Sequence, residues 1–113
     1  MSNVTVDLAT FSELQEAAGA DFVKELVQTF LEEAPAMLQE LRDALAAGDA
    51  DTFRRAAHSL KSNSLTFGAL TLGAMAREQE LGGLAAAQQS NALDALTQEY
   101  DRVAAALQEL SHG

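Results

Sequence analysis

The chain has 113 residues, a length that suits one domain with a single core, and we expect residues 1–113 to form one domain. It contains no cysteine, which excludes disulfides and thiolate metal sites. Its net charge of −10 argues against a nucleic-acid-binding protein, because such a protein needs a basic face to neutralise phosphates.

Apolar residues recur with helical spacing along the chain, and no alternating strand pattern competes with them. Residues 7–18 read as a short helix that Gly19 ends. Asp21 then reads as the N-cap of a second helix, whose apolar stripe begins at Phe22 and continues to Leu45. The N-terminal part of the chain therefore predicts one short and one long helical segment.

Pro35 interrupts the stripe of the second segment. Proline has no backbone N–H, and its ring presses on the carbonyl four residues earlier, which is that of Leu31. We expect either one long helix bent at Pro35 or two nearly collinear helices, ended by Gly48.

Three further helices are predicted in the rest of the chain. The third runs from about residue 52 to 67, the fourth starts near Leu70 and weakens at Gly82 and Gly83, and the last covers about 92–110. Because aromatic residues make up only 5% of the chain, close-packed helices are favoured over strands. The predicted fold class is all-α: an up-and-down four-helix bundle with a short additional N-terminal helix.

The charges are unevenly distributed. Residues 52–77 contain no Asp or Glu, but they contain Arg54, Arg55, Lys61 and Arg77. This block gives an acidic protein a local positive field. A partner with an acidic recess would be steered to it and repelled elsewhere.

His58 lies within this block, on the predicted solvent side of the third helix. A neutral imidazole is a nucleophile at physiological pH, and its Nε2 can accept a phosphoryl group. Lys61 and Arg54 lie on the same side and could offset the added negative charge. Ser62 has a small side chain and would leave room for a partner to reach His58. Leu65 would offer an apolar contact to that partner.

The sequence lacks the residue patterns of metal sites and of nucleotide-binding loops. No HExxH motif, no cluster of histidines with carboxylates and no glycine-rich phosphate loop occurs, so we expect no metal site and no enzymatic activity of the chain's own. On spacing alone, an ordinary solvated face remains an alternative interpretation of the block. His112, next to the end of the chain, is a weaker candidate than His58.

The stretch "AHSLKSNSLTFGA", residues 57–69, resembles the signature of histidine-containing phosphotransfer (HPt) domains, and "FLEEAPAMLQELRDALAAGD" upstream is also typical of them. The resemblance covers nearly the whole chain. It implies a phosphoryl carrier in a two-component phosphorelay, in which His58 accepts the group from a receiver aspartate and passes it to another.

The implied partners are receiver domains of response regulators and a hybrid sensor histidine kinase. The chain itself would need no cofactor, since Mg²⁺ is expected in the partner receiver. The docking residues would be Arg54, Arg55, Ser62 and Leu65, with Lys61 stabilising the phosphoryl charge.

Two positions depart from the family pattern. Ser62 stands where glycine is frequent, and Gln79 stands where relatives place an apolar residue, so Gln79 needs a hydrogen-bond partner if it is buried. Glu80 matches a family position that carries Gln or Glu close to the histidine. It could accept a hydrogen bond from Nδ1 and leave Nε2 free, or it could be an ordinary surface carboxylate.

Two alternatives remain open. The chain could be a docking module that uses Arg54, Lys61 and Leu65 and is never phosphorylated, or it could be the phospho-accepting domain of a chemotaxis-type kinase.

No apolar run is long enough to span a membrane, and no secretory signal is visible. We therefore expect a cytoplasmic protein without membrane insertion. We also expect a monomer, because one bundle uses all of the visible apolar stripes.

Overall fold

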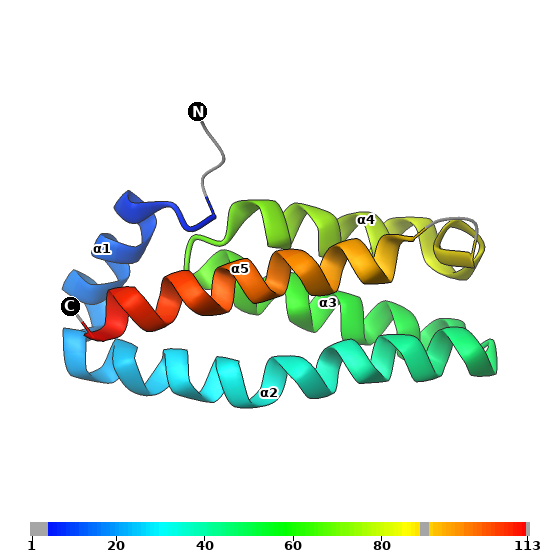
Figure 1. Ribbon diagram of the computed structural model, residues 1–113, viewed down its shortest axis with the longest axis horizontal. Coiled ribbons are helices and arrows are strands. Elements are labelled where there is room, and N and C mark those ends of the chain that lie inside the picture. The colour runs from blue at the N-terminus through cyan, green and yellow to red at the C-terminus, as the bar shows by residue number, and fades with distance from the viewer. Residues whose placement is uncertain (1–4, 89–90, 113) are drawn as a thin grey trace.

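The computed structural model describes residues 5–88 and 91–112, and within them the fold is all-α, as predicted. Figure 1 shows the five helices: α1 (Leu8–Ala18), α2 (Ala20–Ala47), α3 (Ala50–Thr66), α4 (Leu70–Gln88) and α5 (Ala92–His112). None of the described helices is both long enough and apolar enough to cross a membrane.

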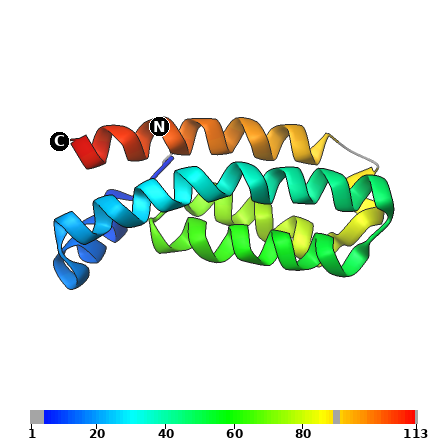
Figure 2. The ribbon, with the colours of Figure 1, turned by 90° about the horizontal axis from the view of Figure 1, so that it is seen from below.

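The four longer helices lie side by side along the long axis of the molecule (Figures 1 and 2). Their main contacts form a ring, in which α2 packs on α3, α3 on α4, α4 on α5, and α5 on α2. The most extensive of these pairs is α3 with α4. The short helix α1 contacts α2 and α3 at one end of the ring (Figure 1). This arrangement agrees in outline with a four-helix bundle that carries an additional N-terminal helix.

The core is a cluster of buried apolar side chains to which all five helices contribute. Around Phe30 it is aromatic: the ring centroids of Phe67 and Tyr100 lie 5.4 and 5.9 Å away. The burial of these apolar faces, more than helix propensity, is what holds such helices together in water. The largest fully buried residues include Phe53, Leu41, Leu60, Leu72, Leu96 and Leu107.

Pro35 lies inside one uninterrupted helix, so the prediction of a single helix is confirmed for this segment, whereas the predicted bend at Pro35 stays a prediction. Because Pro35 has no N–H, the carbonyl of Leu31 loses its usual partner within the helix. The hydroxyl of Tyr100, on α5, donates a hydrogen bond to this carbonyl, with 3.3 Å between the two oxygens. Burial, with a smaller contribution from Asp101, raises the pKa of Tyr100, which keeps the hydroxyl protonated as a donor.

Gly68 ties α1 to the turn between α3 and α4. The N–H of Asp7 donates to the carbonyl of Gly68 at 2.7 Å, and the carboxylate of Asp7 caps α1 by accepting from the N–H of Thr10. Gly68 has a φ of +84°, and a Cβ atom there would lie 2.8 Å from the carbonyl oxygen of Asp7. Both the backbone conformation and the close approach therefore require glycine.

Two details of the second helix were predicted wrongly. Asp21 is not its N-cap, because the helix already begins at Ala20 and Gly19 occupies the cap position. Phe22 is 52% exposed and does not belong to the buried stripe. The buried stripe starts instead at Val23, and adjacent residues of a helix point about 100° apart.

The fourth helix was predicted to weaken at Gly82 and Gly83, and it is interrupted at Gly83. Its backbone angles, φ 71° and ψ −165°, are not helical, although helical segments lie on both sides of it as far as Gln88. Glycine accommodates such a break because it has no Cβ. The α3–α4 pairing before Gly83 is the part of the fold that carries the candidate site.

We expect Tyr100→Phe to lower the free energy of unfolding by about 1 kcal/mol, because it leaves the partly buried Leu31 carbonyl without a donor. In a Pro35→Ala background the new N–H can bond to that carbonyl, so the same Tyr100→Phe change should cost less. Urea unfolding of the four proteins of this double-mutant cycle measures the difference. An equal loss in both backgrounds would show that Tyr100 does not compensate for the proline.

Candidate functional site

Helix α3 holds His58 toward solvent. The carboxylate of Asp49 caps the helix by accepting from the N–H of Thr52 at 3.1 Å. The side chains on one side of α3 are buried in the core, so the side chains on the opposite side point outward. The side chain of His58 is 56% exposed, as the helical spacing predicted. The buried residues of α3 are Phe53, Ala56, Ala57, Leu60 and Ser64.

A single carboxylate from α4 joins His58 to Lys61. Glu80 Oε2 lies 2.8 Å from His58 Nδ1, and Glu80 Oε1 lies 3.1 Å from Lys61 Nζ. The side chains of Glu80 and Lys61 are only 17% and 21% exposed, so both lie against the bundle beneath the more exposed imidazole. Glu80 is therefore not an isolated surface carboxylate, and it reaches both of the residues that the sequence pointed to.

The carboxylate determines which nitrogen of His58 is available. An ionised carboxylate can only accept a hydrogen bond, so the 2.8 Å contact requires a hydrogen on His58 Nδ1. In a neutral imidazole the other nitrogen, Nε2, then carries a lone pair. Because the side chain is more than half exposed, this lone pair is accessible to a visiting electrophile.

The same contacts lower the pKa of Glu80 below its ordinary value of 4.5. The hydrogen bond with His58 is the largest cause, followed by the contact with Lys61, while desolvation acts in the opposite direction. Glu80 therefore stays ionised at neutral pH, so it can accept the hydrogen bond from His58 and pair with the ammonium of Lys61.

The predicted docking residues all lie at the surface. Ser62 is exposed, and Leu65 is 42% exposed. Arg54 lies 3.8 Å from the carboxylate of Asp51, the last acidic residue before the acid-free block. Arg55 donates over 3.4 Å to the backbone carbonyl of Asp51. Both arginines are thus held toward the start of α3.

Sequence reasoning missed Gly73, which lies on α4 under Leu65. A Cβ atom at this position would lie 2.6 Å from Cδ2 and 2.9 Å from Cγ of Leu65. Glycine therefore makes room for the leucine that projects from α3. The available signal was a glycine inside a helical pattern, which is unfavourable and so points to a packing requirement.

Two other singled-out residues do not join the site. Gln79 is 8% exposed, and its Oε1 accepts no hydrogen bond from any described residue, so the expected partner for this atom is missing. It points into the core, about 100° around the helix from Glu80. For His112, the end of α5 is described but the side chain lies outside the described part.

The chemistry of the site is that of a nucleophile with a cation beside it. No group of His, Cys, Asp and Glu among residues 5–88 and 91–112 could hold a metal ion. The outward Nε2 of His58 can attack an electrophile such as a phosphoryl group, and Lys61 and Glu80 supply opposite charges next to it.

Comparisons with known proteins identify the family and a similar fold. The family model described as Hpt domain matches residues 25–111, a range that contains His58, Lys61 and Glu80. The fold is similar to the crystal structure of histidine-containing phosphotransfer protein B (HptB) from Pseudomonas aeruginosa PAO1, with a TM-score of 0.86 and 27% identity over 98% of this chain and 97% of that one. A search of curated proteins by sequence gives no match.

We expect the stability advantage of the wild type over Glu80→Gln to depend on pH. Because the folded-state pKa of Glu80 lies below the unfolded value, the unfolded carboxyl takes up its proton first on acidification. The advantage is then complete above the ordinary value of 4.5 and is lost as the pH falls through the folded pKa. Urea unfolding between about pH 7 and about pH 3 measures it.

Glu78→Gln is the matched control, since it removes an exposed carboxylate from the same helix. If the difference between wild type and Glu80→Gln were constant across this range, Glu80 would not be held by His58 and Lys61 in solution.

Proposed function

Since the chain belongs to the Hpt domain family and is a histidine phosphotransfer carrier of phosphorelays, we propose that His58 is the residue that carries the phosphoryl group. The observation that supports this assignment most strongly is the contact between His58 Nδ1 and Glu80, because it leaves Nε2 as the exposed nucleophile. The group arrives from the aspartyl phosphate of one receiver domain and leaves to the aspartate of another.

In the proposed step, the lone pair of His58 Nε2 attacks phosphorus. The new N–P bond forms as the P–O bond to the receiver aspartate breaks, and the aspartate carboxylate leaves with the electron pair. No proton has to move, because the hydrogen on Nδ1 stays in its bond to Glu80. The imidazole ring becomes positively charged as it bonds to phosphorus, and the adjacent carboxylate stabilises this charge.

Lys61 is proposed to stabilise the charge of the phosphoryl group. Its ammonium lies 3.1 Å from Glu80 Oε1 and one helical turn from His58, so it is held on the correct side before the group arrives. A cation that is already oriented needs little rearrangement to interact with the developing negative charge.

The partner is proposed to supply the rest of the chemistry. The chain would act as a carrier and not as an enzyme, without a cofactor of its own, and Mg²⁺ would be bound by the receiver. Arg54, Arg55, Ser62 and Leu65 form the proposed docking surface around His58, and its positive charge suits an acidic receiver pocket. We further propose that the protein works as a cytoplasmic monomer that a hybrid sensor histidine kinase supplies through its receiver domain.

We expect His58→Gln to abolish acceptance of the phosphoryl group from a phosphorylated receiver, while His112→Gln keeps it. A radiolabel transfer assay measures the acceptance, and the label on the wild type should be stable to base and labile to acid, as a phosphoramidate is. A labelled His58→Gln protein would refute the assignment. Binding of the receiver without any labelling of the wild type would favour the alternative of a docking module.

We expect Lys61→Ala to slow transfer about ten-fold, since one charge-assisted interaction is worth about 1.5 kcal/mol. The unfolding midpoint should change little, because the ammonium fills no core position. Lys24→Ala, which removes an exposed cation of α2, is the control. Stopped-flow transfer and thermal unfolding on the same samples separate the two effects. A large loss of stability with unchanged transfer would make Lys61 a structural residue.

A further inference from the structure

The side of α4 that borders α3 carries a third functional position. Gly73, Arg77 and Glu80 are spaced four and three residues apart, so they lie along one stripe of the helix. At one end Gly73 lies under Leu65, and at the other Glu80 contacts His58 and Lys61. Arg77 lies between these two contacts. Its position on the helix therefore puts it beside the proposed docking surface.

Arg77 is exposed, and within residues 5–88 and 91–112 its guanidinium makes no hydrogen bond and no ion pair. The neighbours of Arg77 on the same helix explain why it has no acidic partner among these residues. The residues four positions away on either side, Gly73 and Leu81, carry no charge. The carboxylate three positions on, that of Glu80, is already engaged by His58 and Lys61. The site itself thus leaves Arg77 without an acidic partner.

The other cations of the acid-free block are occupied. Arg54 lies near Asp51, Arg55 donates to the backbone of Asp51, and Lys61 is held by Glu80. A guanidinium that is exposed and unpaired does not have to break an internal contact before it binds a carboxylate, and its planar fork suits that group.

We propose that Arg77 is a docking residue that binds an acidic side chain of the visiting receiver domain, on the α4 side of His58. The docking surface then extends over α3 and α4, with the receiver held on both sides of the nucleophile. This inference rests on the proposed function and deepens it. Arg77 acts here as a positioning residue, not as a catalytic one. The positive charge of the block and the acidic pocket expected of the partner favour a receiver as the occupant.

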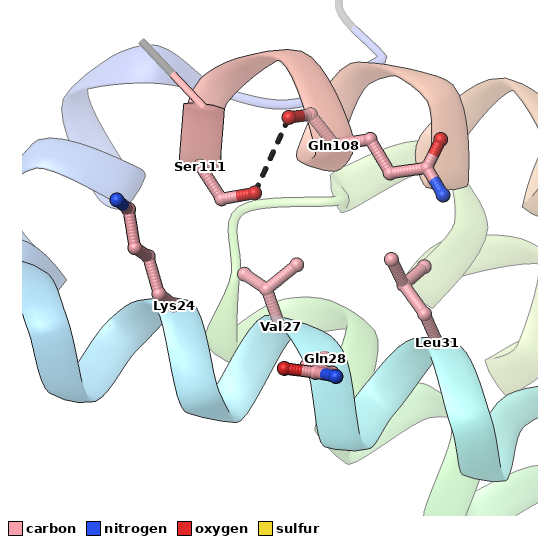
Figure 3. A pocket seen from close by; sticks show the side chains of 6 residues that line it. All are labelled: Lys24, Val27, Gln28, Leu31, Gln108 and Ser111. Carbon is pink, nitrogen blue, oxygen red and sulfur yellow. Dashed lines mark hydrogen bonds between the residues drawn. The ribbon is translucent and has the colours of Figure 1, made fainter.

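A matched control lies on the opposite side of the helix ring. Lys24 lines a groove between α2 and α5 together with Val27 and Leu31 (Figure 3). It is exposed, and no acidic side chain pairs with it in the part of the chain that the structure describes. In the ring of helices, the α2–α5 pair lies opposite the α3–α4 pair. Lys24→Glu therefore changes the net charge by the same amount as Arg77→Glu, but away from His58.

The test compares wild type, Arg77→Glu and Lys24→Glu with a receiver domain selected from a panel for binding to the wild type. Binding is measured by calorimetry with the receiver held in its active form by beryllofluoride. Loading of the histidine is measured with the phosphorylated receiver and, separately, with phosphoramidate, a small donor that needs no docking surface.

We expect Arg77→Glu to weaken receiver binding and slow transfer about ten-fold relative to Lys24→Glu, because it replaces an attraction by a repulsion at the contact. Loading from phosphoramidate should stay the same in all three proteins. Arg77→Ala should show a smaller loss, of about five-fold, since it removes the attraction alone.

Equal behaviour of Arg77→Glu and Lys24→Glu toward the receiver would overturn the proposal, and so would slower loading of Arg77→Glu from phosphoramidate. A panel in which no receiver binds the wild type would overturn it as well. If the wild type bound the receiver but took no phosphoryl group on His58, the proposed function would fail, and the binding comparison would still decide the role of Arg77.

Discussion

The candidate site depends on one carboxylate that crosses from α4 to α3. Glu80 holds Nδ1 of His58 with one oxygen and the ammonium of Lys61 with the other. It thereby determines which imidazole nitrogen is free, where the nearest cation lies and which charge accompanies the ring. The arrangement requires α3 and α4 to be close and in a fixed register. Small buried residues at this pair of helices, Ala57, Gly73 and Ala76, permit that closeness.

The rest of the bundle serves to keep this register. Gly68 fixes the turn between α3 and α4 against the start of α1, through a contact too close for any side chain. On the far side of the ring, Tyr100 completes the hydrogen bonding that Pro35 interrupts in α2. Without Tyr100, this partly buried carbonyl would lack a donor, which would destabilise the fold there. The proposed phosphoryl chemistry therefore takes place at an exposed surface, whereas the geometry of that surface is set by buried and local contacts elsewhere in the fold.

Local patterns were enough to predict the helices and the outward direction of His58, because helical spacing relates a residue to its own helix. The pairing of His58 with Glu80 spans 22 residues and depends on how two helices pack, so only the family resemblance suggested it. The donor for the Leu31 carbonyl comes from another helix and was not predictable from the pattern around Pro35. Asp21 and Phe22 were misjudged because α2 starts two residues earlier than its sequence signals indicate, and because Val23 and the residues that follow already fill the core. Arg77 was visible as a cation, but its lack of a partner follows from the engagement of Glu80, which only the structure reveals.

The proposed transfer requires that His58 carries its hydrogen on Nδ1 and reacts through Nε2. The most direct measurement is nitrogen-15 NMR of the imidazole rings, before and after loading with a phosphoryl group. The proposed mechanism predicts the Nδ1–H form of His58 in the neutral unloaded protein and a bond between phosphorus and Nε2 in the loaded one. A hydrogen on Nε2 in the neutral ring, or phosphorus bound to Nδ1, would contradict it.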